Sequence, residues 1–243
     1  MYSTIDEIAP DIFRISTLIP EVAPGGFAFN QFLVRDEQPF LFHTGMRGLY
    51  PLVSEAVSKV IPLETLRWIS FGHVEADECG AMNMFLADAP HAEVVHGPLA
   101  CMVSLNDLAD RPPQVAGDQP LDLGHHRMVF LPTPHVPHGW ESGLWFDEIT
   151  DTLFTGDLFT QIGDRPALTD DDIVGPALEG EALFHSTVLG PQLLPTLDTL
   201  AALLPTTLAT MHGSSYTGDG TTQLLALAAG YRAMAAEAAA LAA

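Results

Sequence analysis

Four apolar stretches of this chain each end shortly before a histidine or a carboxylate. The stretch at 66–71 (LRWISF) precedes His73, Glu75 and Asp77, while the other three, at 127–132 (RMVFLP), 152–156 (TLFTG) and 206–211 (TTLATM), precede His138, Asp157 and His212. Apolar runs of this length are typical of buried strands, and α/β proteins gather ligand-binding side chains at the carboxyl ends of their strands. The sequence therefore predicts one site built from four separate strand ends.

The order of the predicted elements favours an α/β fold with two stacked sheets. Strand patterns at 12–19, 27–34 and 40–45 predict an N-terminal hairpin, and helical and strand patterns then alternate. Further helices are predicted at 48–61, 80–89, 192–204 and from about 222; further strands at 92–97 and in a hairpin at 143–157; and irregular segments at 107–122, 161–190 and 212–220. Hairpins mixed with alternating helices favour two mixed sheets with outer helices over one doubly wound sheet.

Composition limits what the chain binds. With 243 residues and 47% apolar content, we expect a single globular domain over 1–243. A formal net charge of −22 argues against binding nucleic acid or anionic membrane through a basic surface. Because the sequence has no leader-like start and no long apolar run, we expect a cytoplasmic protein, in which Cys79 and Cys101 remain thiols.

Four motifs resemble the metallo-β-lactamase superfold, and within it the diiron domain of flavodiiron proteins and related oxygen-binding diiron sensor domains. They are H-V-E-A-D-E-C-G at 73–80, P-H-G-W-E-S at 137–142, L-F-T-G-D-L-F at 153–159 and M-H-G at 211–213. The resemblance covers nearly the whole chain. It implies a four-layer αββα sandwich of two mixed sheets with outer helices.

The resemblance also implies a dinuclear metal site. Residues matching His73, Glu75 and His138 bind one metal in the family, those matching Asp77 and His212 bind the other, and Asp157 matches the bridging ligand. Glu75 stands where hydrolases of the superfold have histidine. Because carboxylate oxygen suits harder cations than zinc, two iron ions are expected, with zinc or manganese as the alternative.

Two positions depart from the family pattern. Glu78 stands where relatives usually have histidine; it is either a seventh ligand or a neighbour that leaves a coordination position of the second metal open. We expect ligation, because a carboxylate buried beside metal is costly to leave unpaired. His43 stands where superfold members commonly have aspartate, and it either hydrogen-bonds Asp77 or Glu78 or simply packs in the core.

Four further residues close to the ligands in sequence are candidates for the pocket around the metals. His135 precedes His138 by three residues, but the prolines between them argue against a helix that would turn both toward one ion. It is therefore assigned to the pocket wall. Trp140, Phe159 and Tyr216 either shape an apolar pocket or pack as ordinary aromatic residues.

The function implied is that of a non-haem diiron protein that binds or reduces a diatomic gas, oxygen or nitric oxide. The sequence has no flavodoxin-like segment after the metal motifs, so turnover would need an external electron donor, such as a redox donor protein. Without a donor the chain would bind gas rather than act as an enzyme. Family members often form homodimers. The alternative is a binuclear hydrolase acting on an ester, thioester, lactam or phosphodiester.

Overall fold

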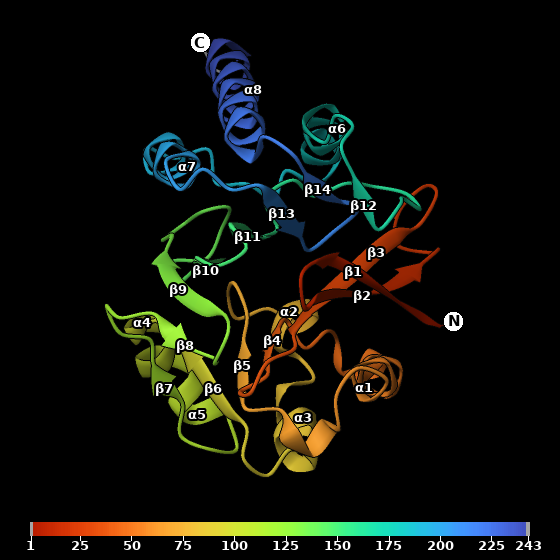
Figure 1. Cartoon of the computed structure of the whole chain (residues 1–243). Helices are drawn as coiled ribbons and strands as arrows, with labels where there is room; N and C mark the ends of the chain where they lie inside the picture. The colour runs from red at the N-terminus through yellow and green to blue at the C-terminus, as the bar shows by residue number, and fades with distance from the viewer. Residues whose placement is uncertain (1, 242–243) are drawn as a thin grey trace.

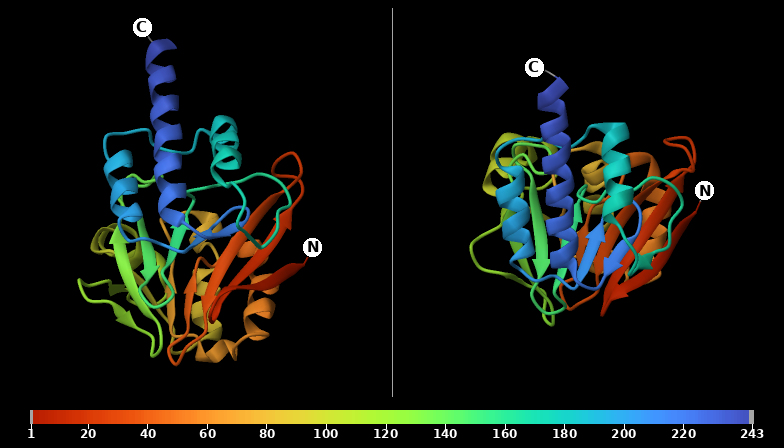
Figure 2. Two further views of the ribbon diagram at one scale, coloured as in Figure 1. Left: turned by 45° about the horizontal axis from the view of Figure 1, so that its top comes forward. Right: turned by 90° about the horizontal axis from the view of Figure 1, so that it is seen from above.

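The computed structural model describes residues 2–241 and contains two seven-stranded mixed sheets packed face to face, with helices on both outer sides (Figure 1). This arrangement confirms the predicted α/β sandwich of four αββα layers. Turned views show α6, α7 and α8 together over one sheet, whereas α1 and α3 lie on the far side of the other sheet (Figure 2).

The first sheet is formed by the N-terminal half of the chain. Its strands follow chain order, with antiparallel pairing from β1 to β4 and parallel pairing from β4 to β7. The strands are β1 Ser3–Ala9, β2 Ile12–Ile19, β3 Phe27–Val34, β4 Phe40–Phe42, β5 Trp68–Ser70, β6 Glu93–His96 and β7 Gln114–Val115. The helices of this half are α1 Tyr50–Ser58, α2 Ala76–Cys79, α3 Met82–Asp88, α4 Pro98–Ala100 and α5 Asn106–Leu108, with 3-10 turns at Arg47–Leu49 and Leu63–Thr65 and a π-helical turn at Cys101–Leu105.

The second sheet has the strand order β12-β14-β13-β11-β10-β9-β8. Its strands are β8 Leu121–Asp122, β9 Arg127–Pro132, β10 Gly143–Asp147, β11 Thr152–Gly156, β12 Leu168–Thr169, β13 Thr207–Thr210 and β14 Ser215–Thr217. Three helices cover it, namely α6 Val174–Phe184, α7 Leu193–Ala201 and α8 Gly220–Leu241. The central strands β10, β11 and β13 are buried along their whole length, as the apolar density of their sequences predicts.

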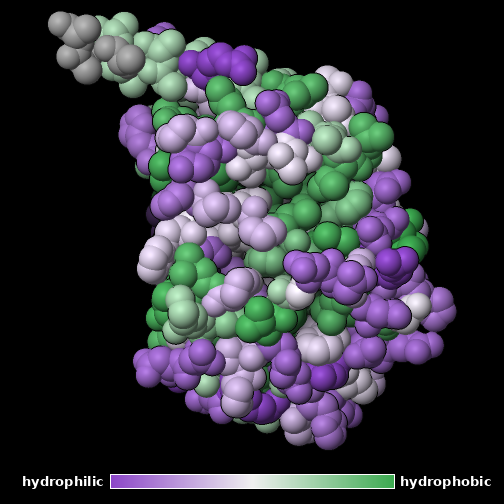
Figure 3. Space-filling view, turned by 90° about the vertical axis from the view of Figure 1, so that its left-hand side faces the viewer, coloured by the Kyte–Doolittle hydropathy of each residue, from purple (hydrophilic) through white to green (hydrophobic). Residues whose placement is uncertain are grey.

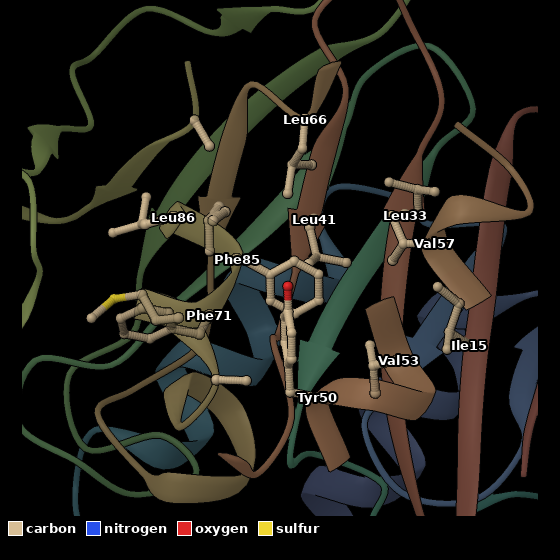
Figure 4. Close-up of a cluster of buried hydrophobic side chains, with 14 of the residues drawn as sticks. Ile15, Leu33, Leu41, Tyr50, Val53, Val57, Leu66, Phe71, Phe85 and Leu86 are labelled. Atoms are coloured by element: carbon tan, nitrogen blue, oxygen red, sulfur yellow. The ribbon is translucent and has the colours of Figure 1, made fainter. Parts of the chain in front are cut away.

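Alternate side chains of the central strands fill different layers of the core. Phe40 and Phe42 of β4 point between the two sheets, whereas Leu41 points to the layer below α1 and α3. In the same way, Trp145 of β10 enters the space between the sheets and Leu144 packs against the helices of the second sheet. Figure 4 shows the layer around Leu41, with Tyr50 and Phe85 packed together. The two-residue period of the strands thus builds the four layers.

Three segments predicted as irregular contain regular structure. Residues 107–122 include the end of α5 and the short strands β7 and β8; residues 161–190 include β12 and α6; and residues 212–220 include β14. The prediction is wrong for α6 because its sequence, VGPALEGEALF, contains two glycines and a proline, which weaken the helical pattern. Close packing of α6 against the backbone requires a glycine at position 180, since a Cβ there would lie 2.6 Å from the carbonyl oxygen of Thr160.

The formal net charge of −22 comes from 31 acidic against nine basic residues. One face shows a band of hydrophobic residues between hydrophilic ones (Figure 3). Within residues 2–241, no helix combines the length and the apolar character needed to cross a bilayer.

Replacing Gly180 with alanine tests the close contact between α6 and Thr160. The added methyl group forces α6 away from a backbone carbonyl, so we expect Gly180→Ala to lower the free energy of unfolding by about 1–3 kcal/mol in a denaturant titration. The matched control is Gly48→Ala, because a Cβ at Gly48 meets nothing within 4 Å. Equal stability of the two variants would contradict the packing role of Gly180.

Candidate metal centre

The four predicted strand ends do meet at one place, and they come from both sheets. His73 follows β5 of the first sheet, whereas His138, Asp157 and His212 follow β9, β11 and β13 of the second sheet. The two sheets are tied together directly beneath the site. Trp145 Nε1 donates a hydrogen bond to Ser70 Oγ at 2.8 Å, linking β10 to the last residue of β5. The geometry of the site therefore depends on the packing of the sheets.

Donor atoms from four residues form one group in which all atoms lie within 4.8 Å of one another: His73, Glu75, His138 and Asp157. Glu75 Oε2 is 2.8 Å from His73 Nε2 and 3.3 Å from His138 Nε2. Asp157 Oδ2 is 3.4 Å from His138 Nε2. This set of two imidazole nitrogens and two carboxylate oxygens is suited to a metal ion.

A second group lies on the other side of Asp157. His212 Nε2 is 3.2 Å from Asp157 Oδ1 and 3.6 Å from Asp77 Oδ2. Asp157 therefore turns one oxygen toward each group. The structure brings together all six residues that the resemblance assigned as ligands, divided as that assignment expected.

Local structure holds these side chains in place. Glu75 precedes α2 in an extended backbone conformation and makes no capping bond, which leaves its carboxylate free to face the site. His212 Nδ1 lies 2.8 Å from the carbonyl oxygen of Ala28, and its ring packs against Phe27 at a centroid distance of 4.3 Å. These contacts direct Nε2 of His212 toward Asp157. A hydrogen bond from the second ring nitrogen is a common feature of histidines that bind metals.

The site is strongly coupled electrostatically. Burial alone would lower the pKa of His73, but the charges of Glu78 and Asp157 and hydrogen bonds to carboxylates outweigh it and raise that pKa to about 12. Burial raises the pKa of Asp77 to about 6, against the attraction of His212. Burial also acts to raise the pKa of Asp157, but the nearby imidazole of His212, together with the charges of His73 and His138, lowers it to about 2. In the metal-free chain, protons on the histidines take the role that cations have in a metal site.

The residues fit a pair of metal ions. Oδ1 of Asp157 is buried and accepts no hydrogen bond of good geometry from the described residues, although His212 Nε2 is near. A buried carboxylate oxygen without a hydrogen bond is costly, and a cation between Asp157 and His212 would satisfy it. Glu75, Asp77 and Asp157 together supply negative charge to offset the metals.

The structure places Glu78 outside both groups. The side chain is fully buried behind His73, where Oε2 accepts a hydrogen bond from the backbone N–H of His73 at 2.6 Å. Oε1 lies 3.3 Å from Nδ1 of His73, on the opposite edge of the ring from Glu75. This position differs from the ligand role expected from the sequence and favours an orienting role, in which Glu78 fixes the ring of His73.

His43 lies beside Glu78, one of the two carboxylates named in the hydrogen-bond expectation, but no hydrogen bond of good geometry joins the two side chains. Its Nε2 lies 3.5 Å from Oε1 of Glu78, and the ring is fully buried against Phe42. Burial lowers the pKa of His43, despite the opposing charge of Glu78. His43 therefore lies behind Glu78, and no ion pair joins it to Asp77 among the described residues.

None of the four predicted pocket residues lines the pocket beside the metal groups, which has a volume of about 530 Å³. His135 and Trp140 are exposed, whereas Phe159 and Tyr216 are buried under the helices of the second sheet. The pocket is formed by five of the candidate ligands together with Phe27, Thr160, Phe184 and Ser186. No sequence pattern indicates Phe27, which lies in a strand far from the motifs. Phe184 lies in α6, a helix that the sequence pattern does not predict.

These features define a metallo-β-lactamase-like sandwich with a candidate dinuclear metal centre. The family model described as ODP family beta lactamase matches residues 27–213, and the chain belongs to this family. A relative named as a diflavin flavoprotein in Thermosynechococcus vestitus is 29% identical over 225 residues, which are 85% of this chain and 38% of the relative. The diflavin flavoprotein A 1 of Synechocystis is 24% identical over 198 residues, 77% of this chain and 34% of that protein. The chain thus spans little more than a third of these relatives.

Solved structures support the same fold. The rubredoxin oxygen:oxidoreductase of Desulfovibrio gigas superposes with a TM-score of 0.80 and 21% identity, covering 94% of this chain and 60% of that one. A flavodiiron core from Synechocystis superposes with a TM-score of 0.81 and 22% identity, covering 95% of this chain and 60% of that one. At these identities the likeness establishes the fold.

Metal binding to this chain is expected to release protons. The pKa of about 12 means that His73 carries a proton at neutral pH in the metal-free chain, and a metal binds only the neutral ring. Lowering the pH therefore increases the competition from protons, and the affinity for the metal should fall about tenfold per pH unit for each proton displaced. Calorimetric titration with Co(II) between pH 6 and 8, in buffers of different ionisation enthalpy, measures this effect. The exposed His125 provides a control variant, His125→Ala, which should leave the pH dependence unchanged. An affinity independent of pH would contradict the expectation.

The position of Glu78 predicts how replacing its carboxylate affects metal binding. We expect Glu78→Gln to keep two metals per chain but to weaken their binding about 10–100-fold, because the orientation of His73 is lost while the ligands remain. Asp77→Asn is the matched comparison on the same helix, and it should reduce the second metal instead. Elemental analysis and competition with a chelator measure the two effects. A fall to one metal per chain in Glu78→Gln would identify Glu78 as a ligand.

Proposed function

We propose that this chain is a non-haem diiron protein that binds or reduces a diatomic gas, oxygen or nitric oxide. The observation that carries the proposal is the donor set, in which three carboxylates and three imidazoles face each other with Asp157 shared between two groups. Carboxylate oxygens favour iron or manganese over zinc. Bound iron would supply the electrons and the open coordination positions that a diatomic gas requires.

The side chains of the site have distinct roles in this proposal. Glu75, His73 and His138 would hold one ion, and Asp77 and His212 the other, with Asp157 between them. The three carboxylates offset three of the four positive charges of two divalent ions, which leaves the centre able to accept an electron-rich ligand. Glu78 would hold the ring of His73 without coordinating a metal itself, because it lies on the far edge of that ring.

Outside the candidate ligands, the pocket is lined by two phenylalanines and two hydroxyl-bearing side chains. The rings of Phe27 and Phe184 lie 5.3 Å apart at their centroids and form part of its wall, beside His212. The hydroxyl of Thr160 donates to the carbonyl of Asp157 at 2.7 Å, so it is already engaged within the protein. The wall outside the candidate ligands therefore adds no charged group, which favours an apolar gas over a charged substrate.

Reduction of a gas consumes electrons, so we propose an external electron donor. The names of the relatives refer to flavins, which supports a flavin-bearing donor protein as the partner. A homodimer, in which one copy brings such a donor to the metals of the other, belongs to the same proposal. The hydrolase alternative is disfavoured, because Glu75 in place of an imidazole makes a bound water less acidic and thus a poorer source of hydroxide.

Reconstitution with iron tests the proposal. Chain prepared without oxygen and loaded with Fe(II) should bind two irons, and exposure to oxygen or nitric oxide should change its optical spectrum. Asp157→Ala removes the carboxylate shared by both groups and should abolish the spectral change and most of the iron. The exposed Glu148 gives a control variant, Glu148→Gln, which should behave as the parent chain. Two tightly bound zinc ions with hydrolytic turnover, and no response to either gas, would overturn the proposal.

A further inference from the structure

A second cavity, of about 580 Å³, lies at the edge of the sandwich where β1 and β2 face the segment before β12. Its lining shares no residue with the metal pocket. Side chains that point into it come from neighbouring strands in register, since Asp6 pairs with Arg14 and Thr4 pairs with Ser16. Figure 1 shows these strands beside β12 and β14.

The polar lining of this cavity is unusual for its place in the fold. Further along the same inner face, Phe32 and Phe42 fill the space between the sheets with apolar side chains. At this edge the corresponding positions are Arg14 and Ser16 on β2, and both are buried. Buried polar residues are the exception in protein cores, and a cation is rarely buried unless it is paired. Arg14 is such an exception, and the nearest carboxylate oxygen, Oδ2 of Asp6, is 4.0 Å away.

Arg14 is poorly satisfied within the protein. It is 3% exposed, and its Nη2 donates a hydrogen bond to the carbonyl oxygen of Gly213 at 2.9 Å. Its Nη1 is 4.0 Å from Asp6 Oδ2, which is too far for a hydrogen bond, and its Nε has no acceptor among the described residues. A guanidinium has five N–H donors and is well suited to a carboxylate. This buried group therefore points to an anionic partner supplied by a ligand.

The charges of the cavity are arranged by depth. Arg14 lies at the bottom, whereas the carboxylates of Glu21 and Asp164 are exposed at the rim, and the side chain of Asp6 is 42% exposed. These carboxylates would repel a simple anion that approaches Arg14. A ligand with a carboxylate at one end and an ammonium group at the other would match both layers.

We propose that this cavity is a binding site for a small zwitterion of amino acid or dipeptide size, with its carboxylate on Arg14 and its ammonium group toward the rim carboxylates. The volume of about 580 Å³ is within the range of small-molecule pockets and exceeds what a single ion requires. Arg165, also in the lining, supplies a second cation for a longer ligand. Binding of such a ligand does not require iron in the metal centre.

The floor of this cavity is connected to the metal centre. Arg14 binds the carbonyl of Gly213, the residue after His212, and Ala28, whose carbonyl lies 2.8 Å from His212 Nδ1, is part of the cavity lining. A molecule on Arg14 would thus rest against the same backbone that holds one candidate metal ligand. Arg14 and the metal pocket therefore contact consecutive residues of the chain, Gly213 and His212.

Binding of simple probes to the full chain tests the proposal. Glycylglycine and 4-aminobutyrate serve as zwitterions, and acetate and ethylamine as probes of each charge alone. Calorimetry and thermal shift should show saturable binding of at least one zwitterion, with each single-charge probe at least about tenfold weaker, because it makes only one of the two ionic contacts. A thermal shift that acetate or ethylamine produces equally would overturn the zwitterion site, as would the absence of saturable binding by either zwitterion.

Variants separate this site from general binding to an acidic protein. Asp6→Asn and Arg14→Gln should each weaken the zwitterion about tenfold or more. Arg14→Gln changes a buried residue, so Asp6→Asn, which alters a half-exposed side chain, provides the result if the first variant fails to fold. Arg127→Gln, an exposed arginine on β9, is the control and should bind as the parent chain does. Unchanged binding in a folded Asp6→Asn variant would overturn the assignment.

Discussion

The contact between the two sheets is the constraint on which the rest of the molecule depends. Three of the candidate ligand segments belong to the second sheet and one belongs to the first, so any sliding of the sheets would separate them. Phe42 and Phe154 meet between the sheets at a centroid distance of 5.5 Å, and Trp145 reaches across to Ser70 just below His73. A hydrogen bond from the backbone N–H of Gly143 to the carbonyl of Gly72 joins the same two segments at 2.8 Å. Apolar packing gives this contact its strength, and the two hydrogen bonds fix its register.

The main layers and the candidate ligands are predictable from the sequence for one physical reason. A buried strand has a strong apolar signal, and the loop after it starts at a definite residue, so the amino-acid pattern alone places polar groups such as His73 and Asp157 at strand ends. Helix α6 is not predictable in this way. Gly180, which weakens the helical pattern, serves a close approach to the backbone of Thr160, and such a contact between distant segments leaves no periodic trace in the sequence.

The orientation of the Glu78 side chain cannot be predicted from the sequence either. Asp77 and Glu78 are consecutive residues of α2, and consecutive side chains on a helix point about 100° apart. Asp77 therefore turns toward His212, whereas Glu78 turns into the protein behind His73. Proximity in the sequence suggests a shared role. The turn of a single short helix gives the two carboxylates different neighbours, and His43, which follows β4, lies 3.5 Å from Glu78.

Asp157 would couple the binding of one metal ion to the binding of the other. Its two oxygens face different groups, so a cation that fixes one oxygen also fixes the direction of the other. The first ion to arrive would then use part of its binding energy to order the second position, and the second ion would find that ordering already complete. Such a centre would bind its two ions cooperatively. Loss of one ion would loosen the other, so the pair would be kept or released together.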